Sequence, residues 1–156
     1  MPTPSLLIEF KCVNKIVGKV RGRAFLRNKK GGGKTIGVFT PAETVQKSNY
    51  LAFQFLNSAG PAHKLYEGTL RVEIATFHEV PASYSKKRAA DCLSGLERPT
   101  KKPDIDNIEK LVLDALNKKA WADDTQVVEI ETKKHYISET GVPEHMIVRI
   151  IDMGLN

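Results

Sequence analysis

The chain has few of the features that mark secreted or membrane proteins. Cysteine occurs only at Cys12 and Cys92, and this wide separation excludes a CxxC pair and a zinc-ligand spacing, so both are expected to be free thiols. No apolar run approaches the roughly 18 residues that a membrane span needs. The N-terminus also lacks the charged and apolar regions of a signal peptide. These absences predict a cytoplasmic protein.

Acidic residues are missing from one long stretch near the N-terminus. Residues 11–34 contain nine lysines and arginines and no aspartate or glutamate, so the remaining chain carries 15 basic and 18 acidic residues. The net charge of +6 therefore comes from this basic arm. Such asymmetry favours a polyanion-binding surface paired with a separate acidic site. A basic loop that is merely solvated remains the alternative, since basic runs are common on protein surfaces.

The pattern within the basic arm predicts a hairpin. Apolar and basic side chains alternate over residues 17–26, as in a strand with one basic face. Gly31, Gly32 and Gly33 interrupt the alternation before a second extended stretch at residues 35–39. These glycines are therefore expected to form a flexible tip between two strands.

The rest of the chain mixes strands and helices without a regular alternation of the two. The clearest helix runs from Ile108 to Leu116, where apolar residues recur at i, i+3, i+4, i+7 and i+8. Alternating patterns predict strands near residues 6–13, 70–78, 126–136 and 146–151. Residues 1–156 are therefore predicted to form a single compact α+β domain, in which a mixed sheet packs against two or three helices.

Carboxylates are concentrated in the second half of the chain. Asp104 and Asp106 follow Pro103, and an extended backbone there would point both side chains the same way. Asp123 and Asp124 recur after one helix length of chain. Four carboxylates brought together would repel one another unless a hard cation lay among them, and Mg²⁺ takes oxygen ligands of this kind. The pattern predicts Mg²⁺-assisted phosphate chemistry with these four residues as metal ligands.

Each acidic pair also has an ordinary structural interpretation. An aspartate before a helix commonly caps it, and Asp106 is well placed to do so. An Asp-Asp pair commonly lies in a polar turn before a strand. Lys110 lies one turn beyond Asp106 on the same side of the helix, so its ammonium group is expected beside the carboxylates. Two acidic pairs, this lysine and the basic arm together favour the metal site.

The acidic segment resembles the RusA family of Holliday junction resolvases, including its phage-encoded members. The resemblance is strongest over residues 101–134 and rests on three motifs: Lys102-Pro103-Asp104-x-Asp106-Asn107, then Leu113-Asp114-Ala115-Leu116-Asn117, then Trp121-x-Asp123-Asp124-x-Gln126-Val127. The basic arm and the segment Phe39-Thr40-Pro41 extend the resemblance over most of the chain.

The resemblance implies a Mg²⁺-dependent, dimeric endonuclease that nicks four-way DNA junctions symmetrically in recombination and repair. The essential acidic positions of the family fall on Asp104, Asp106 and Asp124, with Asp123 as the adjacent carboxylate. Its functional lysine falls on Lys110. Two alternatives remain open, a protein that binds branched DNA without cutting it and a small Mg²⁺-dependent nucleotide phosphohydrolase.

The DNA contacts are expected along the basic arm, in the loop before Asp104 and at a basic position on the strand after Asp124. Phosphate contacts from such side chains give affinity with little base information. The residues predicted to make them are Lys19, Arg21, Arg23, Arg27, Lys29, Lys30, Lys101, Lys102 and Lys134.

Overall fold

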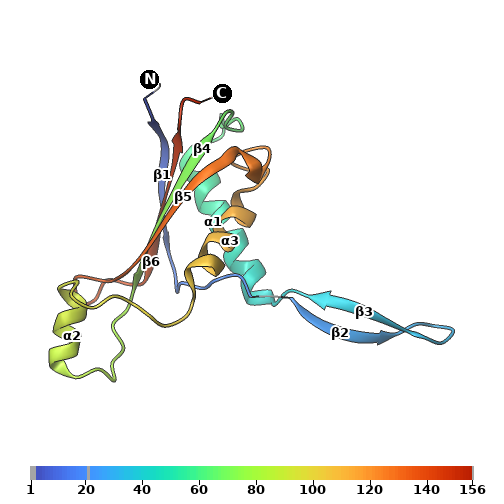
Figure 1. Ribbon diagram of the computed structural model, residues 1–156, viewed down its shortest axis with the longest axis horizontal. Coiled ribbons are helices and arrows are strands. Elements are labelled where there is room, and N and C mark those ends of the chain that lie inside the picture. The colour runs from blue at the N-terminus through green and yellow to red at the C-terminus, as the bar shows by residue number, and fades with distance from the viewer. Residues whose placement is uncertain (1–2, 21, 156) are drawn as a thin grey trace.

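The computed structural model describes residues 3–20 and 22–155, without the side chain of Arg23. Arg21, a predicted DNA contact, lies outside the described residues. The elements follow one another as β1 (Ser5–Val13), β2 (Arg23–Asn28), β3 (Lys34–Phe39), α1 (Ala42–Ala59), β4 (Leu70–His78), α2 (Lys86–Leu93), α3 (Ile105–Leu116), the 3₁₀ turn η1 (Asp124–Gln126), β5 (Val127–Tyr136) and β6 (His145–Asp152). Figure 1 shows their arrangement.

A mixed four-stranded sheet forms the body of the molecule, in the order β1-β6-β4-β5. β4 and β5 run parallel, whereas β6 is antiparallel to both β1 and β4. A parallel pair needs a long crossover, and here the crossover carries α2 and α3. α1 and α3 pack together on one face of the sheet, while α2 lies at one end of the molecule (Figure 1). The predicted α+β class with a mixed sheet is confirmed.

The core lies between the sheet and the α1–α3 layer. Leu70, Val72 and Ile74 of β4 point into this layer and are almost fully buried. α3 turns its predicted apolar stripe toward them, and all five members are buried: Ile108, Leu111, Val112, Ala115 and Leu116. Because burial of each large aliphatic side chain contributes about 1.5–3 kcal/mol, this stripe fixes α3 against the sheet. No helix within the described residues is long and apolar enough to cross a membrane.

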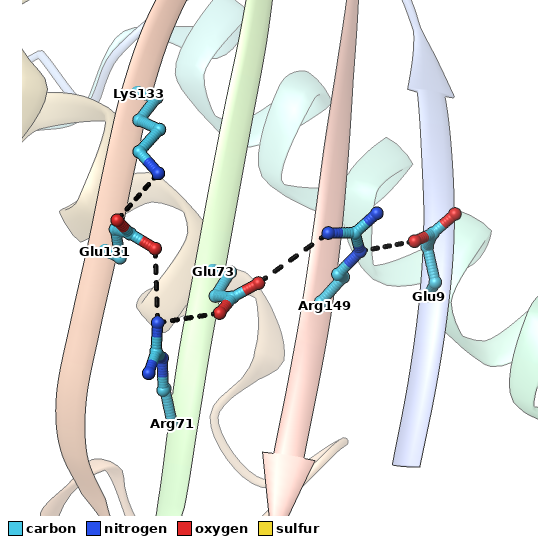
Figure 2. Close-up of polar contacts among 6 residues, drawn as sticks. All are labelled: Glu9, Arg71, Glu73, Glu131, Lys133 and Arg149. Carbon is cyan, nitrogen blue, oxygen red and sulfur yellow. Dashed lines mark hydrogen bonds and ion pairs between the residues drawn. The ribbon is translucent and has the colours of Figure 1, made fainter. Parts of the chain in front are cut away.

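The other face of the sheet is open and carries a ladder of ion pairs (Figure 2). Arg71 lies 2.8 Å from Glu73 and 3.2 Å from Glu131, and Lys133 lies 2.8 Å from Glu131. Positive and negative groups therefore alternate across all four strands. The six members of the ladder are Glu9, Arg149, Glu73, Arg71, Glu131 and Lys133.

β2 and β3 form a separate two-stranded hairpin that projects from the body (Figure 1). Gly31, Gly32 and Gly33 all have positive φ, at 106°, 91° and 93°, so the predicted glycine tip is confirmed. Leu26 pairs with Ile36 on one face, and their exposed fractions are 67% and 70%. A lone two-stranded hairpin is only marginally stable in water, and the main contacts of β2 and β3 are with each other.

Candidate active site

α3 begins one residue after Asp104. Asp104 occupies the N-cap position with an extended backbone (φ −74°, ψ 154°), and Asp106 falls in the first helical turn. The predictions that Asp106 caps the helix and that both aspartates share an extended segment are therefore wrong. Proline restricts the residue before it rather than the one after it, so Pro103 does not keep the chain extended. The Asp104 side chain makes no capping hydrogen bond, which leaves its carboxylate available to a ligand.

Asp104 and Asp106 both line a cavity of about 570 Å³ at this end of α3. The base of the basic arm forms another part of its wall through Gly18 and Lys19. The backbone N–H of Lys19 donates to the carbonyl of Asn107 at 2.8 Å. A Cβ at Gly18 would lie 2.6 Å from the Cβ of Asn107, so glycine permits this close approach. The arm and the two aspartates are thereby held at one site.

Two further charged residues line the same cavity. Glu43 comes from the first turn of α1, and Lys102 comes from the loop before Asp104. The cavity wall therefore includes three carboxylates together with the lysines at positions 19 and 102. Sequence reasoning missed Glu43, because an acidic residue in a first helical turn is ordinary and carries no functional signal. Only the packing of α1 beside α3 brings it to this place.

Lys110 lies where its spacing predicts. Its Nζ is 3.2 Å from the Oδ2 of Asp106, one turn earlier on the same face of α3. Both side chains are more than half exposed, so the ammonium group remains open to a ligand at this end of the helix. The catalytic role of Lys110 stays a prediction.

The second acidic pair lies at the far end of α3. Trp121 forms an isolated bridge with Asn117, the C-cap residue directly after α3. The indole Nε1 of Trp121 donates to the Oδ1 of Asp124 at 2.8 Å. Since a helix rises about 1.5 Å per residue, the length of α3 separates Asp104 from this end by roughly 18 Å.

Asp123 has a structural role as the cap of η1. Its Oδ1 accepts from the N–H of Thr125 at 2.9 Å, and the Oε1 of Gln126 accepts from the N–H of Asp123 at 3.2 Å. Hydrogen bonding by Thr125 holds the pKa of the Asp123 carboxyl below its usual value. Its carboxylate is therefore partly engaged within its own turn.

Within one chain, the pair Asp104 and Asp106 and the pair Asp123 and Asp124 do not form a single site. In residues 3–20 and 22–155, no three His, Cys, Asp or Glu side chains are grouped closely enough to hold a metal ion. The structure brings Asp104 and Asp106 to one cavity, and it leaves Asp123 and Asp124 beyond the other end of α3. The four metal ligands therefore remain predictions.

Lys134 lies against the segment that precedes Asp104. Its Nζ donates to the carbonyl of Lys101 at 2.6 Å and to that of Pro103 at 2.8 Å. Partial burial lowers the pKa of Lys134, while the Asp104 carboxylate acts in the opposite direction. Backbone carbonyls thus already engage the ammonium group, and the predicted DNA contact of Lys134 stays a prediction.

The other predicted DNA contacts differ in how far their charges are compensated. Lys19 forms an ion pair with Asp114 of α3. Exposed basic groups without an ion pair among the described residues lie on the hairpin and in the loop: Arg27, Lys29, Lys30, Lys101 and Lys102. This pattern contrasts with the compensated ladder on the open face of the sheet.

Comparison with known proteins identifies the family of the chain. The family model for endodeoxyribonuclease RusA matches residues 15–146, from the basic arm to the start of β6. The chain is also 32% identical over 137 residues to the uncharacterized protein YqaN of Bacillus subtilis (strain 168), an alignment that covers 86% of this chain and 92% of YqaN. Both matches include the acidic segment and most of the described fold. The chain belongs to the RusA family of endodeoxyribonucleases.

Proposed function

We propose that this protein is a Mg²⁺-dependent, homodimeric endonuclease that resolves four-way DNA junctions during recombination. The observation that carries the proposal is the cavity in which Asp104 and Asp106 meet the base of the basic hairpin. A positively charged arm gives affinity for a DNA backbone, whereas a phosphohydrolase for free nucleotides would leave this arm without a role. The family match supports the same class of reaction.

The donor set at the start of α3 fits Mg²⁺. Asp104 and Asp106 offer carboxylate oxygens to an open cavity, and Mg²⁺ in nucleic-acid enzymes is usually held by one or two carboxylates together with waters and substrate phosphate. Bound there, the ion would activate a water for in-line attack and neutralise charge on the phosphate. The two aspartates would hold the ion.

Lys110 would act beside these carboxylates. Its Nζ lies 3.2 Å from Asp106, so a phosphate bound at this end of α3 would come close to the ammonium group. A fixed cation at that point stabilises the negative charge that develops in the transition state. The start of α3 adds the partial positive charge of a helix N-terminus. The hairpin cations, which we define as Arg27, Lys29, Lys30 and Lys34, would hold the DNA arms through their phosphates.

A second copy of the chain would complete each site. Asp104 and Asp124 lie near opposite ends of α3, so one chain cannot apply both to one phosphate. A two-fold axis that places two α3 helices antiparallel would bring the Asp104 end of one copy to the Asp124 end of the other. The same symmetry supplies the paired nicks that junction resolution requires. We define Asp104, Asp106 and Asp124 as the proposed catalytic carboxylates.

The first experiment tests the activity. The protein is incubated with Mg²⁺ and a labelled four-way junction, a linear duplex of the same sequence, or a nucleoside triphosphate. We expect paired symmetric nicks in the junction alone. A junction complex without nicks would favour a non-cleaving binding protein, and released phosphate would favour the phosphohydrolase.

The second experiment tests the shared site by mixing subunits. Asp104→Asn and Asp124→Asn proteins, each inactive alone, are unfolded, mixed and refolded together. If sites are shared, a mixed dimer contains one doubly altered site and one intact site, so single nicks return. If each chain carries its own complete site, both sites of the mixed dimer are defective and no nicks appear. When the ratio of the two proteins is varied, the nicking rate should be highest where they are mixed in equal amounts.

A further inference from the structure

The side chains of Arg98 and Lys134 form hydrogen bonds between the loop before Asp104 and the end of β5. Arg98 donates from Nε to the carbonyl of Lys134 at 2.6 Å. Lys134 in turn donates from Nζ to the carbonyls of Lys101 and Pro103 at 2.6 and 2.8 Å. These three hydrogen bonds connect residues 98–103, the second part of the loop between α2 and α3, to a single strand position. The last of them reaches the residue directly before Asp104.

The strand position itself is fixed by the sheet. In the parallel pairing of β4 and β5, Lys134 lies opposite Thr76, whose side chain is fully buried. The neighbouring Lys133 points to the open face, where it pairs with Glu131 (Figure 2). Successive strand residues alternate between faces, so only Lys134 of this pair can reach the loop. The end of β5, which is paired with β4, therefore contacts a segment that has no regular structure of its own.

We infer that Lys134, together with Arg98, positions Asp104 for metal binding rather than contacting DNA. Because the Nζ of Lys134 already donates to two backbone carbonyls, it has few N–H groups free to bind a phosphate. A catalytic carboxylate must be held close to its productive geometry, since a displacement of about 1 Å can cost about 10²-fold in rate. This inference rests on the proposed function, because it assigns Asp104 to the metal.

The test compares Lys134→Met with Lys133→Met. Each change removes one positive charge from adjacent residues, but only the first removes the hydrogen bonds to the loop. We expect Lys134→Met to lower single-turnover cleavage at saturating junction by about 10–100-fold and to raise the Mg²⁺ concentration for half-maximal rate. Junction affinity and its salt dependence should match those of the Lys133→Met protein, which should cleave normally.

A readout without metal or DNA separates this inference from the proposed activity. In the metal-free protein, amide hydrogen exchange over residues 98–106 should be faster in Lys134→Met than in wild type and unchanged in Lys133→Met. If wild type cuts no junction, the proposed function fails, and the exchange comparison still tests the connection. Should Lys134→Met fail to fold, Arg98→Ala tests the same segment through its other contact.

Three results would overturn the inference. Unchanged amide hydrogen exchange over residues 98–106 in Lys134→Met would show that Lys134 does not hold this loop in place. Faster exchange with unaltered cleavage would show that the connection does not position Asp104. A salt slope reduced by about one unit with normal cleavage at saturating junction would identify Lys134 as a phosphate contact.

Discussion

Replacing Lys110 by alanine distinguishes a structural from a catalytic role of this residue, because the two roles predict effects of very different size. In the folded protein, the side chain makes one i,i+4 ion pair with Asp106, and the two partners are 54% and 61% exposed. An exposed helical pair of this kind is worth about 0.3–0.5 kcal/mol. The melting temperature of a chain of this size should then fall by only about 1–2 °C. Folding, dimerisation and junction binding should persist.

The catalytic role predicts a far larger effect. If Lys110 stabilises charge that develops in the transition state, its loss should lower the cleavage rate by about 10²–10³, which corresponds to about 2.7–4 kcal/mol. This is several times the ground-state value of the ion pair. Lys110→Arg should also be impaired, because a planar guanidinium does not reproduce the position of a compact ammonium group.

The assay is single-turnover cleavage of a labelled junction at saturating protein and Mg²⁺, with thermal melting of the same preparations. Lys133→Ala is the matched control, since Lys133 also forms an exposed ion pair but lies on the open face of the sheet. Normal cleavage by Lys110→Ala would refute the catalytic role. A loss of the same size in Lys133→Ala would show that the effect comes from general charge rather than from position.

Three further predictions concern the acidic site, the hairpin and the protonation of His78. Replacing any one of the proposed catalytic carboxylates by asparagine should abolish cleavage, while junction affinity, measured by gel shift, stays equal or increases. Asp114→Asn is the control, and this protein should cleave the junction at a nearly normal rate. Neutralising the hairpin cations together should flatten the slope of log affinity against log salt, which fluorescence anisotropy measures; an unchanged slope would leave the arm a solvated loop. Burial lowers the pKa of His78, so the unfolded chain takes up the proton first and the free energy of unfolding should fall as pH drops below about 6.5. Urea titrations at pH 8 and pH 5 should show this loss, and His78→Gln should reduce it.

The sequence by itself determined the elements whose signal is local. The apolar stripe of α3 repeats at helical spacing and ends up buried as predicted, because burial of one helical face is decided by periodicity. Gly31–Gly33 form the hairpin tip, because consecutive positive φ values strongly favour glycine. The spacing of Asp106 and Lys110 on one helical face also follows from the chain alone.

Only the tertiary structure decided how distant segments meet at the site. The sequence could not show that Asp104 rather than Asp106 occupies the N-cap position of α3, since an aspartate at either place satisfies the capping pattern. It gave no signal for Glu43, whose place in the cavity depends on the packing of α1 against α3. It also could not separate Lys133 from Lys134, because strand register sends one to the open face and the other to the loop before Asp104. Long-range packing sets such positions, and no local pattern encodes it.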